Sequence, residues 1–123
     1  VELYTIFLRW ERTSLNKRIK DRIKDMLLKG WIDEVENLLE LQTNRQKVFS
    51  SLNSIGYKHI KSFLNNEISK KEMFEIIYIR TRQLARRQEK WFKKEPIDLF
   101  VMMDSLKSEK IYKILDCFVK RIP

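Results

Sequence analysis

Cationic and aromatic side chains are concentrated in one short segment, Thr81–Lys94. Its fourteen residues include six Lys or Arg, one Glu, one Trp and one Phe, so the segment carries +5 of the formal +9 charge of the chain. Cations pair with phosphates, and aromatic rings offer a face on which bases stack. The segment is therefore predicted to meet a polyanion such as a nucleic acid, and an ordinary solvated helix face is the alternative.

A second cationic pair lies nearer the N-terminus. Arg18 and Arg22 are four residues apart, so on a helix both guanidinium groups project from the same side. Such a pair can hold a phosphate or a carboxylate. Asp21 and Asp25 lie in the same stretch, however, and a solvated face on which the arginines pair with these aspartates is the interpretation that the pattern alone favours.

The residues that usually build metal or nucleophilic sites are scarce. His59 is the only histidine and Cys117 the only cysteine, so neither a zinc site nor an intramolecular disulfide is predicted. His59 is interpreted as a surface or structural histidine. Gly56 follows a stretch rich in Ser and Asn, and a glycine there would allow the backbone to approach a ligand closely.

A long helix must carry the cationic segment. Ser69 and Glu72 match a capping box, which predicts a helix from this point to about Lys94. The expected inward stripe of this helix consists of Met73, Ile77, Leu84 and Trp91. Its spacing in threes and fours indicates core packing, including for Trp91. Thr81 and Gln88 fall on the same stripe and would need hydrogen-bond partners on another helix or on a nucleotide.

The cations of this helix are expected on two flanks of the stripe. One flank consists of Arg82, Arg86 and Lys93, and the other of Arg87, Lys90 and Lys94. A helix with this arrangement can lay its cations along a phosphate backbone.

The rest of the chain is also predicted to be mainly helical. The further helices expected are one from a Ser14 cap to a stop at Gly30, and the ranges Ile32–Leu41, Tyr57–Leu64 and Asp104–Arg121. The last of them has an expected inner face of Ile111, Ile114, Leu115, Phe118 and Val119. Strands are predicted over Leu3–Trp10 and near Leu99–Met103. The first is almost continuously apolar, which is typical of a parallel sheet covered on both faces, so further strands of this sheet are expected to be missing.

Composition limits the class of protein. With 123 residues, 43% of them hydrophobic, and only two Gly and two Pro, the chain is predicted to form one mostly helical domain. No apolar run approaches the roughly 20 residues that span a bilayer, and no leader precedes the first predicted strand. A cytoplasmic protein is expected, which agrees with the single cysteine.

Several motifs occur in an order and spacing that together resemble a known family. They are Arg18-Ile19-x-x-Arg22, Gly30-Trp31-Ile32-Asp33-Glu34-Val35, Ser54-Ile55-Gly56-Tyr57-Lys58, Glu67-Ile68-Ser69 and Thr81-Arg82-Gln83-Leu84-Ala85-Arg86-Arg87-Gln88-x-x-Trp91-Phe92. Across about ninety residues they resemble the C-terminal half of bacterial tRNA dimethylallyltransferases. The Ile-Gly-Tyr-Lys element and the final run are the most specific parts.

The resemblance implies an enzyme of tRNA modification. Such an enzyme transfers a dimethylallyl group from dimethylallyl diphosphate to N6 of adenosine 37, beside the anticodon, after the base is flipped into a channel. A P-loop-type α/β core with a helical insertion, Mg²⁺, the tRNA anticodon stem-loop as partner and a monomeric state are implied with it. The implied tRNA-binding residues are Asn53, Ser54, Ile55, Gly56, Tyr57, Lys58, Arg86, Arg87, Gln88, Lys90, Trp91, Phe92 and Lys93. The resemblance also puts Arg18 and Arg22 near the channel, where one of them would help to neutralise the diphosphate.

The chain departs from this family in two ways. It has no Gly-x-x-x-x-Gly-Lys-(Ser/Thr) loop, and it lacks the N-terminal aspartate that serves as general base toward N6. Residues 1–123 are therefore expected to be the C-terminal part of a dimethylallyltransferase domain whose P-loop half is absent, with no catalytic residue of their own. This chain alone is expected neither to bind the prenyl donor tightly nor to catalyse transfer. The alternatives are a stand-alone, non-catalytic helical RNA-binding module, a degenerate remnant, and a piece that complements a separately encoded half.

Overall fold

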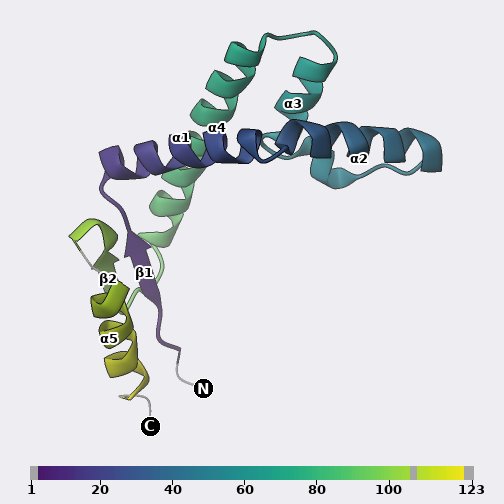
Figure 1. Ribbon diagram of the computed structural model, residues 1–123. Coiled ribbons are helices and arrows are strands. Elements are labelled where there is room, and N and C mark those ends of the chain that lie inside the picture. The colour runs from purple at the N-terminus through teal and green to yellow at the C-terminus, as the bar shows by residue number, and fades with distance from the viewer. Residues whose placement is uncertain (1–2, 106–107, 121–123) are drawn as a thin grey trace.

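The computed structural model describes residues 3–105 and 108–120, and it confirms a mostly helical chain with two short strands. In chain order the elements are β1 (Ile6–Arg9), α1 (Arg12–Leu28), α2 (Trp31–Arg45), the 3-10 helix η1 (Ser50–Asn53), α3 (Tyr57–Leu64), α4 (Lys70–Phe92), β2 (Leu99–Met102), the 3-10 helix η2 (Met103–Ser105) and α5 (Ser108–Val119). Helices α1 to α4 form one end of the molecule, and the strand pair with α5 forms the other (Figure 1). The four helices predicted before residue 95 are all present, with their ends shifted by a few residues.

Helices α1, α2, α3 and the first half of α4 enclose the hydrophobic core. Its buried side chains are Ile23, Trp31, Val35, Leu52, Ile60, Met73 and Ile77. Burying one large aliphatic side chain contributes about 1.5–3 kcal/mol to folding, so this cluster is the main source of stability in the helical end of the molecule. The last fully buried residue of α4 is Ile77, one turn before the cationic segment begins at Thr81.

Two glycines with positive φ angles redirect the chain at the core. Gly30 (φ 98°) separates α1 from α2, as predicted, and Gly56 (φ 92°) precedes α3. A Cβ atom on Gly56 would overlap the ring of Trp31, while one on Gly30 would find its nearest neighbour, Oδ2 of Asp33, at 3.9 Å. The expectation that Gly56 is a glycine so that a ligand can approach is thus corrected, because the close approach is made by Trp31.

The helix starts were predicted with mixed success. The capping box that opens α4 is confirmed, since the Ser69 hydroxyl accepts from the Glu72 amide at 3.1 Å and the Glu72 carboxylate accepts from the Ser69 amide at 3.5 Å. The Ser14 cap is wrong. Helix α1 starts earlier, and Glu11 is its N-cap, with Oε2 accepting from the Ser14 amide at 3.3 Å. A carboxylate oxygen can accept from a helix amide as a hydroxyl oxygen does, so the presence of Ser14 alone did not identify the N-cap.

The two strands form a parallel pair. Ile6 lies opposite Leu99 and Arg9 opposite Met102, so the first strand is shorter than predicted and the second is where it was predicted. Aspartate side chains bind backbone amides at both ends of the pair. The amide of Thr5 donates to Oδ2 of Asp98 at 2.6 Å, and the amide of Glu11 donates to Oδ2 of Asp104 at 2.6 Å. The sheet has two strands among the described residues, and Leu8 is 50% exposed, which agrees with the expectation that further strands of this sheet are missing from the chain.

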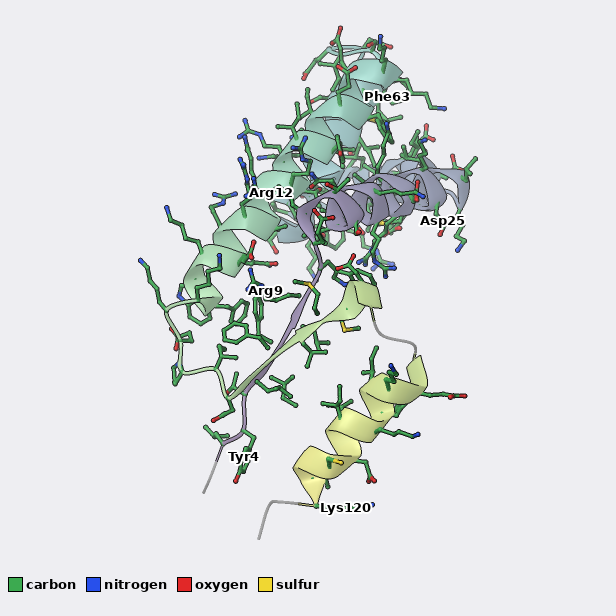
Figure 2. The ribbon with its side chains drawn as sticks, turned by 90° about the vertical axis from the view of Figure 1, so that its left-hand side faces the viewer. Tyr4, Arg9, Arg12, Asp25, Phe63 and Lys120 are labelled. Carbon is green, nitrogen blue, oxygen red and sulfur yellow. The ribbon has the colours of Figure 1, made fainter. Side chains whose placement is uncertain are left out.

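Aromatic contacts attach the strand pair to the end of α4. The ring of Phe7 lies 5.4 Å from that of Phe92 and 5.8 Å from that of Phe100, between ring centroids. The molecule is elongated as a result, with Phe63 of α3 and Lys120 at opposite ends and Arg9 between them (Figure 2).

Helix α5 is more exposed than the sequence pattern predicted. Val119, expected on its inner face, is 64% exposed, and Leu115 is also exposed. Ile111 and Ile114 are partly buried, and Cys117 is exposed. Residues 106, 107 and 121 of the predicted helix lie outside the described residues, as does the side chain of Phe118, which was expected on the inner face. An amphipathic pattern indicates which face a helix can bury, and among the described residues that face of α5 has little against which to pack.

Candidate nucleic-acid interface

The second half of α4 extends beyond the helices that cover its first half. Helix α1 crosses α4 near its middle, and α4 then continues toward the strand pair (Figure 1). Trp91 is 58% exposed and Leu84 is exposed as well, so the prediction that both lie in the core is wrong. The stripe continues in sequence, but no second helix lies against it. Trp91 contacts Phe92 edge to face, with ring centroids 4.9 Å apart.

The polar residues of that stripe did not need a partner on another helix. The Thr81 hydroxyl donates to the carbonyl oxygen of Ile77 at 2.7 Å, one turn earlier in the same helix. Gln88 is exposed, so water can satisfy its amide. The prediction of a buried polar pair is corrected for the same reason as that of a buried Trp91.

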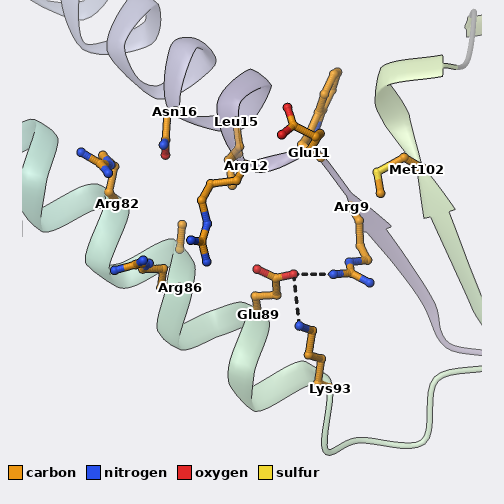
Figure 3. A pocket seen from close by; sticks show the side chains of 12 residues that line it. Arg9, Glu11, Arg12, Leu15, Asn16, Arg82, Arg86, Glu89, Lys93 and Met102 are labelled. Atoms are coloured by element: carbon orange, nitrogen blue, oxygen red, sulfur yellow. Dashed lines mark hydrogen bonds and ion pairs between the residues drawn. The ribbon is translucent and has the colours of Figure 1, made fainter.

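One flank of α4 faces the start of α1 across a cavity of about 280 Å³. Its lining residues are Arg9, Trp10, Glu11, Arg12, Leu15, Asn16, Arg82, Ala85, Arg86, Glu89, Lys93 and Met102. Figure 3 shows Arg12 extending from the first turn of α1 toward α4. The three α4 cations expected on one flank, Arg82, Arg86 and Lys93, do line one cavity. An adjoining groove is lined by Arg12, Arg86, Glu89, Lys90 and Lys93.

Glu89 is the acidic centre of this cationic cavity. Its Oε1 accepts from Nη2 of Arg9 at 2.6 Å and lies 3.7 Å from Nζ of Lys93 (Figure 3). The hydrogen bond from Arg9 holds the pKa of the Glu89 carboxyl below its ordinary value, with the charge of Lys93 acting in the same direction and partial burial acting against them. The pair neutralises one arginine of the cavity and ties β1 to α4.

The two arginines of α1 have different surroundings. The guanidinium of Arg18 lies over the ring of Trp10, 4.1 Å from its centroid. Asp25, expected to pair with these arginines, instead pairs with Lys29 at 2.8 Å. Arg22 is exposed. A guanidinium stacked on an indole keeps its edge available for an anion, so the geometry of Arg18 is compatible with a phosphate-binding role.

Residues 53–58 form a separate candidate region, at the junction of η1 and α3. Asn53, Ser54 and Lys58 are exposed, whereas Gly56 is buried. The hydroxyl of Tyr57 donates to Oε1 of Glu34 at 2.9 Å, and this bond, with the negative charge and some burial, raises the pKa of Tyr57. None of these residues lines the cavity or the groove of α4.

His59 is a structural residue. It is buried, and its Nδ1 accepts from the Gly56 amide at 3.2 Å, which requires the neutral ring. Burial, with the charges of Lys58 and Arg80, lowers its pKa. Of the two interpretations made from the sequence, structural is confirmed and surface is wrong.

Comparison with known proteins identifies the family. Residues 1–95 match the family described as IPP transferase. The chain belongs to this family. It is 44% identical over 94 residues to a tRNA dimethylallyltransferase of Campylobacter jejuni, and 40% identical over 102 residues to that of Campylobacter lari. These matches cover 76% and 80% of this chain, but 31% and 34% of the relatives, so the chain spans about a third of their length.

Solved IPP transferases share the fold. A tRNA isopentenylpyrophosphate transferase from Bacillus halodurans superimposes with a TM-score of 0.86 at 26% identity, covering 96% of this chain and 38% of that one. A tRNA isopentenylpyrophosphate transferase from Staphylococcus epidermidis gives 0.85 at 25% identity, over 95% and 37%. The arrangement of β1, β2 and the helices is therefore that of part of these transferases.

The cavity residues of this IPP transferase chain that sequence reasoning missed include Arg9, Trp10 and Arg12. Each comes from the segment around the end of β1, about eighty residues before its partners on α4, as the Arg9–Glu89 pair illustrates. Neither spacing nor local charge connects segments so far apart. The available signal was only that Arg9 and Arg12 are cations flanking a predicted strand end.

Two classes of site are not found in the part of the chain that the structure describes. No group of three or more His, Cys, Asp or Glu side chains is placed to hold a metal ion. Among the same residues, no helix is long and apolar enough to cross a membrane.

Proposed function

We propose that this chain is the tRNA-contacting part of a dimethylallyltransferase, which transfers a dimethylallyl group from dimethylallyl diphosphate to N6 of adenosine 37 in tRNA. The observation that carries the proposal is the exposed, cationic second half of α4, in a chain whose curated relatives are named tRNA dimethylallyltransferases. A helix that leaves the core with its cations and an indole exposed has the features of a surface that binds RNA.

Different residues of α4 have different parts in this proposal. Arg86, Arg87, Lys90 and Lys93 contact backbone phosphates, which fix the position of the anticodon loop without reading its sequence. Trp91, with its indole largely exposed, offers a face for one unpaired base, an interaction worth about 1–3 kcal/mol. Gln88, exposed on the same half, can donate and accept hydrogen bonds at a base edge.

The region of residues 53–58 supplies a second tRNA contact in this proposal. We assign the contact to Asn53, Ser54 and Lys58, whose side chains are exposed. Ile55 is partly buried, Tyr57 is held by its hydrogen bond to Glu34, and Gly56 leaves room for the ring of Trp31. The motif is thus divided into residues that touch RNA and residues that hold the turn.

The chemistry itself requires groups that these 123 residues do not contain. In the transfer, N6 attacks the first carbon of the dimethylallyl group, diphosphate leaves with the bonding electrons, and the N6 proton passes to a general base, which we expect to be an aspartate of the P-loop part. Within this chain, Arg18 and Arg22 would take up negative charge as the diphosphate leaves. No acidic cluster among the described residues fits Mg²⁺, so no step is assigned to the metal here.

The strand pair supports an assembly with a P-loop part. Parallel sheets of two strands are rarely stable alone, because their faces need covering. Leu8, Phe100 and Met102 of this pair are exposed by 50%, 48% and 45%. We propose that the further strands and helices of the complete enzyme cover these side chains, and that the complete enzyme acts as a cytoplasmic monomer.

The experiment that tests the tRNA contact is binding of this chain to an anticodon stem-loop with adenosine 37, at two salt concentrations. The Arg86→Ala, Arg87→Ala double variant is expected to bind about a hundredfold more weakly at low salt, with its slope of log affinity against log salt reduced by about 1.4. The matched control is Lys70→Ala, Lys71→Ala, which removes two charges from the other end of the same helix and should bind within about twofold of wild type.

The outcomes separate the candidate functions. Equal loss in both double variants would mean that only total charge matters, and would contradict the assignment of α4. A turnover assay with donor and tRNA should show no product from this chain alone. Formation of product would contradict the expected need for a P-loop part. Tight binding that is specific for the anticodon loop, in a cell that has no P-loop partner, would favour the stand-alone RNA-binding module.

A further inference from the structure

The cavity of Figure 3 brings together cations from two helices that are far apart in the sequence. Arg12 lies in the first turn of α1, Arg86 lies on α4, and Lys93 is the C-cap residue of α4. All three line the cavity, and the same three line the adjoining groove together with Glu89 and Lys90. Arg12 lies outside the motifs that resemble the dimethylallyltransferases and has no role in the proposed function so far.

The carboxylates that line the cavity are already engaged. Glu89 accepts from Arg9 at 2.6 Å, and Glu11 accepts from the Ser14 amide at 3.3 Å as the cap of α1. For Arg12 and Arg86, no ion pair within 4 Å occurs among the residues that the structure describes. Lys93 lies 3.7 Å from Oε1 of Glu89 and shares this carboxylate with Arg9, so the charge left for an anion from outside is mainly that of Arg12 and Arg86.

The position of Arg12 points the same way. Helix α1 has 17 residues, and the N-terminus of a helix carries a partial positive charge that favours anions and disfavours cations. The first turn of α1 contains no acidic residue and does contain Arg12. Two carboxylates already meet the amides at this end, because Glu11 accepts from the Ser14 amide and Asp104 accepts from the Glu11 amide, and Asp104 does not line the cavity. The guanidinium of Arg12, rather than the helix end, is therefore the group of α1 that can hold an anion in the cavity.

We propose that this cavity binds one backbone phosphate of the RNA, held jointly by Arg12 from α1 and by Arg86 and Lys93 from α4. The inference rests on the proposed function and adds to it a residue and a second helix. Through it the RNA contacts both the long helix and the start of α1. Because β1 leads directly into α1, a phosphate held here also sets the position of the RNA relative to the strand pair.

The first test compares Arg12→Gln with Lys24→Gln in this chain, using the same anticodon stem-loop. Both variants remove one positive charge from an exposed position of α1, but Lys24 lines neither the cavity nor the groove. Arg12→Gln is expected to weaken binding about tenfold and to reduce the salt slope by about 0.7, the value for one lost phosphate contact. Lys24→Gln is expected to stay within about twofold of wild type. Equal effects of the two variants would overturn the proposal.

A double-mutant cycle tests whether the phosphate is shared. If Arg12 and Arg86 hold the same phosphate, replacing one arginine should weaken binding less when the other has already been replaced. The Arg12→Gln, Arg86→Gln variant should therefore bind about twentyfold more weakly than wild type, rather than about a hundredfold. Fully multiplicative effects would mean two separate phosphates and would overturn the shared site. Circular dichroism of each variant checks that the helices are intact.

A competition arm distinguishes the RNA backbone from the diphosphate of the prenyl donor. Inorganic pyrophosphate should displace RNA from wild type and from Arg12→Gln to the same extent. Displacement that depends on Arg12 would assign the cavity to a free diphosphate and overturn its assignment to RNA.

The failure of this inference is also distinct from that of the proposed function. If only the Arg86→Ala, Arg87→Ala variant loses RNA, the function stands without the Arg12 site, and if no variant loses RNA, both fail.

Discussion

The two halves of α4 share one helix and one periodic pattern, yet they do opposite things. In the first half, Met73 and Ile77 are completely buried among three other helices. In the second half, the stripe continues through Leu84 and Trp91, which are exposed, and cations surround it. The pattern of a helix indicates which face can be buried, while the neighbouring elements decide how far along the helix burial extends.

The largest effect that separates the halves is expected from Ile77→Ala. Removing a completely buried aliphatic side chain leaves a cavity, so the free energy of unfolding should fall by about 4 kcal/mol. The matched change Leu84→Ala, seven residues later on the same stripe, should lower it by less than about 1 kcal/mol, because Leu84 is exposed. Urea unfolding followed by circular dichroism measures both. Similar losses would show that the second half is also covered, and the contrast would disappear.

The next largest loss in the free energy of unfolding is expected at Gly56, in the turn of residues 53–58. Gly56→Ala places a Cβ in the ring of Trp31 and at a positive φ angle, and should cost about 3 kcal/mol. Gly30→Ala also places a Cβ at a positive φ angle but overlaps no neighbouring atom, and should lower the free energy of unfolding by about 1 kcal/mol. Thermal unfolding compares them. Equal losses would mean that backbone strain alone explains Gly56, and that Trp31 moves without difficulty.

The smallest expected effect is a dependence of stability on pH that comes from the packed half. The pKa of His59 is lowered from 6.5 in the folded chain, so the unfolded chain binds more protons as the pH falls through 6.5. The stability that the neutral ring provides is fully present above pH 6.5 and is lost as the pH falls toward the folded pKa. The midpoint of thermal unfolding should therefore fall further for wild type than for His59→Gln when the pH is lowered from 7.5 to 5.5. Parallel losses would show that another group titrates.

The sequence predicted the elements better than their surroundings. The capping box at Ser69, the turn at Gly30 and the strand near Leu99 follow from local chemistry, and all three are confirmed. The burial of Trp91 was wrong because it depends on which elements reach that part of α4. Arg9 and Arg12 were missed for a related reason, since only the folded chain brings the end of β1 beside α4.

The aspartates at the ends of the strand pair have a consequence for how the sheet is assembled. Asp98 binds the amide of Thr5, Asp104 binds that of Glu11, and both bonds join residues 93 positions apart. A slip of one residue between β1 and β2 would break both bonds at once, so the alignment of these strands is encoded within the pair. In the complete enzyme that we propose, further strands would therefore join a pair whose alignment is already fixed by its own residues.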